Sequence, residues 1–244
     1  MNERINRLRS RSLDAIPSLS DERARLLTRF YQTGIARTAP VPVQRAMAFA
    51  HIMGNKAIFI DPDELIVGER GPAPKATPTY PEVCVHSLED LEIIDGREKV
   101  AFGVDESVRA IYRDEIIPFW KGHAIRETLF FHLPEEWKAA YTAGIFTEFQ
   151  EQRSPGHTAC GDKIYRNGLL ALQAEIRDAI EHLDFFNDPQ AMDKKNQLEA
   201  MAIAADGLMD FARRHADALK QMADRESDPL RQAELEQMAA ICRR

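Results

Sequence analysis

The last third of the chain carries the clearest hydrophobic pattern, in which apolar residues recur every three or four positions. This spacing predicts an amphipathic helix that begins at Asp162. Its apolar face consists of Tyr165, Leu169, Leu172, Ile176, Ile180 and Leu183. Asn187, Asp188 and Pro189 are expected to stop this helix and begin another, with Asp188 at the N-cap and Pro189 in the first turn.

The next helix is predicted from a second apolar series with the same spacing. Its members are Leu198, Met201, Ala205, Leu208, Ala212, His215, Leu219 and Met222. Two long helices joined by a short turn should lie antiparallel and pack along these faces. The sequence at 227–229 predicts the start of a third helix, with Leu235, Met238 and Cys242 in phase. No Gly, Asn or Pro follows Cys242 to end this helix. A frayed natural terminus and a truncation within the helix explain the missing end signal equally well.

The first half of the chain predicts shorter elements. Ser20 precedes two acidic residues, which is typical of a helix start, and that helix should end near Gly34. Pro40 and Pro42 precede a second helix. Its shared face is formed by Met47, Ala50 and Met53. A mostly α-helical chain follows from these patterns.

Short aliphatic runs at 57–60 and 65–67 flank Asp61-Pro62-Asp63 and predict two strands around a turn. Residues 68–81 hold so many Gly and Pro residues that we expect a loop without regular structure. Ser87, with Asp90 three positions later, predicts a capping box at the start of a short helix.

From residue 105 onward we expect helices separated by three prolines. These are Pro118, Pro134 and Pro155.

Composition limits the class of protein. With 244 residues, 44% of them hydrophobic and 29% charged, the chain can form one large soluble domain or two small ones. The net charge of −7 argues against a nucleic-acid partner. The arginine-rich start is followed by no apolar segment, so neither a secretory signal nor a membrane anchor is expected. Three scattered cysteines predict no disulfide framework and a reducing cytoplasm.

Residues 148–162 are the best candidate for a ligand site. They place Phe149, His157 and Cys160 around a Pro-Gly turn that precedes the long helix. Polar side chains on a turn between packed helices can form a pocket wall. From the residues alone, a structural role is favoured for His157, as a cap of the following helix. No zinc site is expected, because the pair Cys84/His86 lies far from His157/Cys160 and lacks the usual ligand spacing.

An ordered series of motifs resembles the N-terminal region of glycyl radical enzymes of the pyruvate formate-lyase type. The series reads DELIVGE at 63–69, TYPEVC at 79–84, IIPFW at 116–120, AGIFTEF at 143–149 and GHTACGDKIY at 156–165. Within that family the chain looks most like the trans-4-hydroxy-L-proline dehydratase branch. The resemblance implies that residues 1–244 are the N-terminal portion of a ten-stranded β/α barrel, wrapped by helices.

The resemblance also implies a radical mechanism. In the family, a separate iron–sulfur, S-adenosylmethionine-dependent activase makes a glycyl radical, which is passed to a cysteine on a loop of the barrel. This sequence contains neither a Gly-Cys-x-Glu loop nor an Arg-Val-x-Gly-Tyr motif. We therefore expect a portion that stops before the catalytic cysteine loop and the glycyl radical domain. It should have no catalytic residue, bound cofactor or metal of its own, and should be inactive alone.

Two residues match pocket positions of the hydroxyproline dehydratase branch, so the resemblance assigns Phe149 and His157 to substrate binding. Cys160 is expected to be a packing residue. The remaining polar candidates are expected to be surface or structural: Glu148, Glu151, Arg153, Glu69, Tyr80, Glu82 and, in a helical core, His215.

The implied partners are a small-molecule substrate, the activase and a second copy in a homodimer. Two alternatives stay open. The chain could belong to another branch, such as a formate acetyltransferase, a choline or diol lyase or an arylacetate decarboxylase. It could also be a stand-alone helical interaction module, which a monodisperse monomer would favour.

Overall fold

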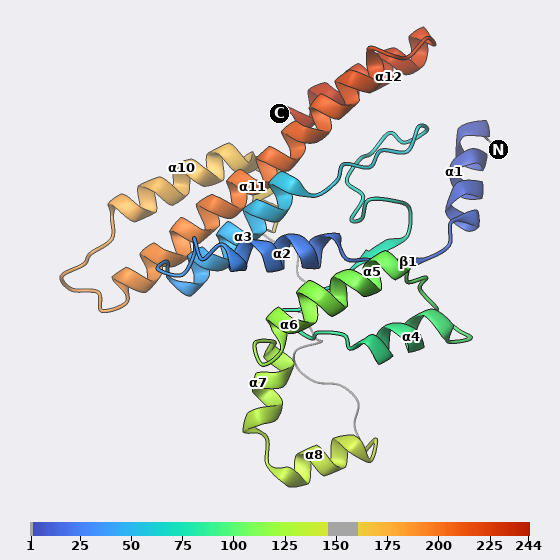
Figure 1. Ribbon diagram of the computed structural model, residues 1–244. Helices are drawn as coiled ribbons and strands as arrows, with labels where there is room; N and C mark the ends of the chain where they lie inside the picture. Colours follow the sequence, from blue (N-terminus) through green and yellow to red (C-terminus); the bar gives the residue numbers. More distant parts are fainter. Residues whose placement is uncertain (1, 146–160) are drawn as a thin grey trace. The chain divides into compact units, whose positions relative to one another are not determined.

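A computed structural model describes residues 2–145 and 161–244 of the chain (Figure 1). Its contacts divide the chain into two compact units. Unit 1 comprises Met1–Asp14, Arg29–Ala73 and Ala159–Arg244, and unit 2 comprises Ala15–Thr28 and Pro74–Thr158. The described residues are mostly helical with two short strands, so the fold class predicted from the sequence is confirmed.

Unit 1 is built around one long helix, α11, which spans Ala191–Ala223. The other helices that lie within unit 1 are α1 (Glu3–Asp14), α3 (Val41–Asn55), α9 (Lys163–Arg166), α10 (Gly168–Glu181) and α12 (Pro229–Cys242). Helices α3, α10 and α12 pack against α11. The predicted antiparallel pair is confirmed, since α10 and α11 run alongside each other around a loop (Figure 1). Gln173 Nε2 joins the two helices by donating to Asp206 Oδ1 at 2.7 Å.

The predicted apolar face of α11 is partly wrong. Met201 and Leu208 are 45% and 40% exposed, whereas small residues between them are buried. A Cβ atom added to Gly207 would lie 2.9 Å from the Cα of Ala50 in α3, so the two helices approach too closely there for a larger side chain. The close crossing of α3 and α11 therefore selects Gly and Ala over the bulky residues of the apolar series.

The end of α11 and helix α12 form the main core of unit 1. Its buried residues are Ala216, Leu219, Ala223, Leu235, Met238 and Ala239. The predicted start of α12 is confirmed, because the Asp228 side chain accepts a hydrogen bond from the backbone of Leu230 at 3.0 Å. Asp228 thus acts as the N-cap of α12.

The helix predicted to begin at Asp162 is interrupted. Gly168, at the start of α10, has a φ of +72°, a conformation that L side chains rarely adopt, and it separates α9 from α10. Tyr165 lies before this break and is 84% exposed, so its assignment to the apolar face was wrong. Asp162 pairs with Arg166 at 2.6 Å and makes no side-chain cap bond. Helix α11 begins after Gln190, whose backbone N–H donates to Asp188 Oδ1 at 2.9 Å.

The two strands predicted at 57–60 and 65–67 are absent from the structure, and both segments are irregular. The turn between them is correct, with the N–H of Glu64 donating to the carbonyl of Asp61 at 3.1 Å. Basic side chains satisfy carbonyls along this stretch. Arg214 donates to the carbonyl of Lys56 at 2.6 Å, and Arg231 donates to that of Glu64 at 2.9 Å. These long-range donors hold the residue that precedes each of the two segments.

Unit 2 contains a two-stranded parallel sheet of β1 (Ser18–Ser20) and β2 (Ala76–Pro78). Strand β2 lies inside residues 68–81, so the prediction of a loop without regular structure was wrong at those three positions. Its proline stands at the last position of the strand, where the missing N–H disturbs the ladder least. Helix α2 (Glu22–Gln32) follows β1 and starts and ends as predicted.

The helices of unit 2 are short. They are α4 (Leu88–Gly96), α5 (Glu106–Ile111), α6 (Ile117–Trp120), α7 (Ile125–His132) and α8 (Glu135–Thr142). The capping box of α4 is confirmed, with Ser87 and Asp90 each bonding the other's backbone N–H. Pro134 separates α7 from α8 as predicted, but Pro118 does not break its helix. A π-helical turn, η1 (Tyr112–Ile116), leads into α6. Pro118 lies in the first turn of α6, where the backbone N–H that proline lacks is not needed for a helical hydrogen bond.

Candidate functional site

The predicted substrate-binding residues Phe149 and His157 lie outside the described residues, as do Cys160, Glu148 and the other polar residues up to 160. On the N-terminal side the description ends just after α8, and it resumes at Gly161 before α9. The structure therefore leaves the assignment of Phe149 and His157 as a prediction.

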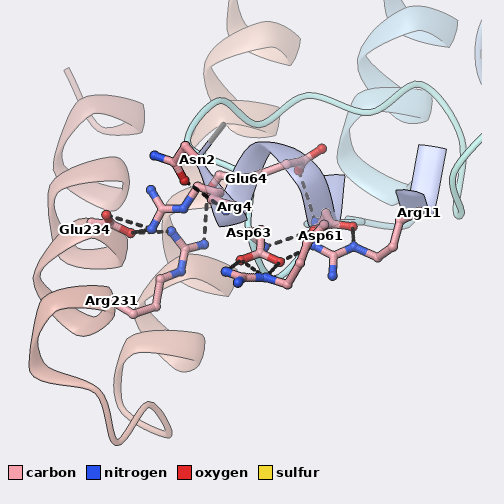
Figure 2. Close-up of polar contacts among 9 residues, drawn as sticks. Asn2, Arg4, Arg11, Asp61, Asp63, Glu64, Arg231 and Glu234 are labelled. Carbon is pink, nitrogen blue, oxygen red and sulfur yellow. Dashed lines mark hydrogen bonds and ion pairs between the residues drawn. The ribbon is translucent and has the colours of Figure 1, made fainter. Parts of the chain in front are cut away.

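Among the described residues, the densest group of charged side chains is an arginine–carboxylate cluster in unit 1 (Figure 2). It consists of Arg4, Arg7, Arg11, Asp61, Asp63, Glu64, Arg231 and Glu234. The cluster joins three segments that are far apart in the sequence: helix α1, the turn at 61–64 and helix α12.

Three of the four arginines of α1, Arg4, Arg7 and Arg11, each bind a carboxylate with two nitrogen–oxygen contacts or more. Arg7 donates to Asp63 at 3.0 and 2.5 Å, and Arg11 donates to Asp61 at 2.8 and 2.6 Å as well as to Asp63. Arg7 and, next, Arg11 hold the pKa of Asp63 far below its usual range. Because the carboxylates of Asp61, Asp63 and Glu234 each accept from a guanidinium, the cluster is a structural contact between segments rather than a reactive centre.

A second polar cluster lies in unit 2 around the TYPEVC motif. Arg23 of α2 binds the Glu82 carboxylate with two contacts, one of 3.1 Å, and its guanidinium lies 4.0 Å from the centre of the Tyr80 ring. The hydroxyl of Tyr112 is buried and donates to Thr79 Oγ1 at 2.6 Å. Burial raises the pKa of Tyr112 to about 12, so the phenol stays protonated. These contacts hold the motif against α2 and η1. Tyr80 is 47% exposed, which agrees with the expected surface position, whereas Glu82 is partly buried and paired with Arg23.

His215 is a core histidine, as predicted. It is 3% exposed, its Nδ1 lies 2.9 Å from the carbonyl oxygen of Phe211, and the two rings meet edge to face. Burial lowers its pKa and favours the neutral ring. No group of three His, Cys, Asp or Glu side chains within residues 2–145 and 161–244 could hold a metal ion.

Unit 1 also carries an open groove of about 500 Å³ between the segment at 58–62 and helices α11 and α12. Its lining is mixed: Phe59, Met222 and Leu235 are among its apolar residues, Arg225 and Arg231 are basic, and Glu226 is acidic. It contains no cysteine, histidine or serine that could act as a nucleophile.

Comparison with known proteins identifies the family. Residues 1–244 match the family described as "PFL-like: Pyruvate formate lyase-like". The chain belongs to this family of glycyl radical enzymes. It is 45% identical over 240 residues to the trans-4-hydroxy-L-proline dehydratase of Clostridioides difficile, covering 98% of this chain and 30% of that protein. An isethionate sulfite-lyase of Nitratidesulfovibrio vulgaris is 29% identical, over 93% of this chain and 28% of its own length.

Solved structures show the same relationship. The C. difficile hydroxyproline dehydratase, crystallised with trans-4-hydroxy-L-proline bound, matches 99% of this chain with a TM-score of 0.93. The glycerol-bound, B12-independent glycerol dehydratase of Clostridium butyricum matches 100% of the chain with a TM-score of 0.89 at 28% identity. The chain thus has the fold of the N-terminal part of these barrel enzymes, and it spans about 30% of the length of the relatives it matches.

Sequence reasoning missed the arginine–carboxylate cluster. Arg4, Arg7 and Arg11 are spaced by three and four, which places them on one face of a helix, but neither helix α1 nor this face was predicted from the sequence. Their partners come from residues at 61–63 and 234, which only the fold brings together. In the part of the chain that the structure describes, no helix is both long and apolar enough to cross a membrane.

Proposed function

We propose that this chain supplies the N-terminal part of a glycyl radical dehydratase that acts on trans-4-hydroxy-L-proline. The observation that carries the proposal is the difference in similarity between relatives. Identity to the C. difficile hydroxyproline dehydratase is 45% over 98% of the chain, whereas identity to the isethionate sulfite-lyase of N. vulgaris is 29%. Because a pocket wall must match its substrate, closer overall similarity supports a shared substrate class.

In this proposal, Phe149 and His157 form part of the pocket wall. An aromatic ring at 149 can pack against a pyrrolidine ring and exclude water. The imidazole of His157 can donate or accept a hydrogen bond, which suits the polar groups of an amino acid. Both roles rest on the matched positions in the family.

The radical chemistry would come from outside this sequence. A glycyl radical, installed by an S-adenosylmethionine-dependent iron–sulfur activase, would supply hydrogen abstraction through a cysteine in the rest of the enzyme. The residues of this chain would bind and orient the substrate and keep water out. We therefore expect no turnover by this chain alone, and we place the intact enzyme in the cytoplasm as a homodimer.

The test is His157→Ala in the complete, anaerobically activated enzyme. Loss of a hydrogen bond to a charged substrate costs about 1.5–3 kcal/mol, so we expect the KM for trans-4-hydroxy-L-proline to rise by roughly tenfold or more, with unfolding unchanged. His182→Ala is the matched control, because His182 is exposed at the end of α10 and far from 157 in the sequence. An unchanged KM in His157→Ala would remove His157 from the pocket.

A substrate panel tests the dehydratase assignment separately. Activated enzyme should consume trans-4-hydroxy-L-proline in preference to isethionate, glycerol, choline and pyruvate. Turnover of one of these others, without turnover of hydroxyproline, would move the protein to another branch of the family.

A further inference from the structure

We infer that helix α1 is an arm that can detach from unit 1 and is held there mainly by ion pairs. The turn at 61–64 and Glu234 form its receptor, an acidic surface on which the arginines of α1 dock. This inference does not depend on the substrate of the enzyme. It rests on how α1 is attached, on how its receptor is built, and on the difference between Arg9 and the other arginines of the same helix.

Helix α1 has no buried residue along its twelve positions. Of its apolar residues, Ile5 and Leu13 are 53% and 68% exposed and Leu8 is half-buried, whereas α12 buries Leu235 and Met238 in the core of unit 1. Apolar burial is the usual anchor of a surface helix, and a helix of about twelve residues is marginal in water without one. The attachment of α1 must therefore come largely from its polar contacts.

Those contacts involve one face of the helix. Arg4 binds both oxygens of Glu234 at 2.8 and 2.6 Å, while Arg7 and Arg11 bind the aspartates of the turn. Two-point binding of a carboxylate by arginine is stronger and more directional than a single contact. Arg9 has a different orientation and, among the residues that the structure describes, pairs with no carboxylate.

The receptor is organised by contacts that do not involve α1. Asp61 Oδ1 accepts from the N–H of Asp63 at 2.9 Å, and Glu64 Oε2 accepts from the N–H of Asp61 at 3.1 Å. Arg231 ties this turn to α12, donating to the carbonyl of Glu64 and to the carboxylate of Glu234, each at 2.9 Å. Figure 2 shows these groups converging on the side where α1 lies. The acidic surface should therefore keep its shape when the arm leaves.

An arm held in this way should respond to salt. The Debye length falls from about 10 Å at 0.1 M ionic strength to about 3 Å at 1 M, which weakens partly exposed ion pairs. The side chains of Arg7 and Arg11 are 52% and 39% exposed, so salt can reach them. An undocked α1 should also lose its helix, which makes backbone exchange a direct readout of docking.

Hydrogen–deuterium exchange of the full chain, read by mass spectrometry at 50 mM and 1 M NaCl, tests the inference. We expect the amides of residues 3–14 to exchange at least about tenfold faster at 1 M, while those of α11 stay protected, since one decade corresponds to about 1.4 kcal/mol. Arg11→Gln should give fast exchange already at 50 mM, whereas Arg9→Gln should not. Gln and Arg have similar helix propensity, so the pair isolates the ion pairs.

Asp63→Asn supplies a second variant that leaves the sequence of α1 intact. It should release the arm at 50 mM as Arg11→Gln does. Three results would each overturn the inference. The first is an exchange rate in α1 that does not change with salt, and the second is an equal rate in Arg9→Gln and Arg11→Gln. The third is an α1 whose amides are already unprotected in the wild type at 50 mM NaCl.

Discussion

The crossing of α3 and α11 makes a quantitative prediction at Gly207. In most helix interiors, replacing Gly by Ala stabilises a protein by about 0.5–1 kcal/mol, because Gly loses more backbone entropy on folding. At this position a Cβ atom would lie 2.9 Å from Cα and 3.2 Å from Cβ of Ala50. Both atoms are part of or fixed to the backbone of α3, so neither can rotate away.

The added methyl group must therefore separate the two helices. Overpacking of this kind costs roughly 1–3 kcal/mol. Subtracting a gain in helix propensity of about 0.5–1 kcal/mol leaves a net loss of up to about 2.5 kcal/mol, centred near 1 kcal/mol, in the free energy of unfolding. For a chain of this size, about 1 kcal/mol corresponds to a fall in Tm of roughly 2–4 °C.

Gly54→Ala is the matched control. Gly54 lies in α3, on the other helix of the same pair, and a Cβ atom there would meet no heavy atom within 4 Å. It should leave Tm unchanged or raise it, because only the propensity effect remains. Thermal unfolding followed by circular dichroism at 222 nm measures both variants. A Gly207→Ala variant as stable as the wild type would refute the close crossing of α3 and α11.

Two further predictions concern buried polar groups. Tyr112→Phe should destabilise unit 2 by about 1–2 kcal/mol in urea unfolding, because it removes the hydrogen bond to Thr79 and leaves a buried hydroxyl behind. The double variant with Thr79→Val should cost less than the sum of the single changes, and full additivity would contradict the contact. Burial lowers the pKa of His215 in the folded protein, so the unfolded chain takes up a proton first as pH falls below about 6.5. Stability should therefore decrease between pH 7.5 and 5.5, and His215→Gln should reduce that decrease; an identical pH dependence would refute it.

Local signals at Ser87 and Asp228 predicted two helix starts, whereas the N-cap expected at Asp188 was wrong, because α11 begins after Gln190. Ser87 and Asp228 act as caps through bonds to backbone N–H groups two or three residues away, so their effect can be seen in a short stretch of sequence. The break at Gly168 was missed, although it is also local, because the apolar spacing continues across it.

Failures elsewhere came from contacts between distant residues. The segments at 57–60 and 65–67 have the composition of strands but are irregular, and distant side chains, Arg214 and Arg231, hold the carbonyls of the residues just before them. The exposure of Met201 likewise depends on the approach of α3, which the pattern of α11 alone cannot reveal. The assignment of Phe149 and His157 to substrate binding was predicted from the family resemblance and stays a prediction, since the residues alone favoured a structural role for His157.

The most direct test of the proposed function is a chimera in which this chain replaces the matching 30% of the C. difficile trans-4-hydroxy-L-proline dehydratase. Electron paramagnetic resonance after anaerobic activation would first establish that the chimera folds and carries the glycyl radical. We expect a radical-bearing chimera to consume trans-4-hydroxy-L-proline. His157→Ala within this chimera should raise the KM for trans-4-hydroxy-L-proline. A chimera with a full radical signal and no dehydration of hydroxyproline would contradict the proposal that this chain forms part of a hydroxyproline pocket.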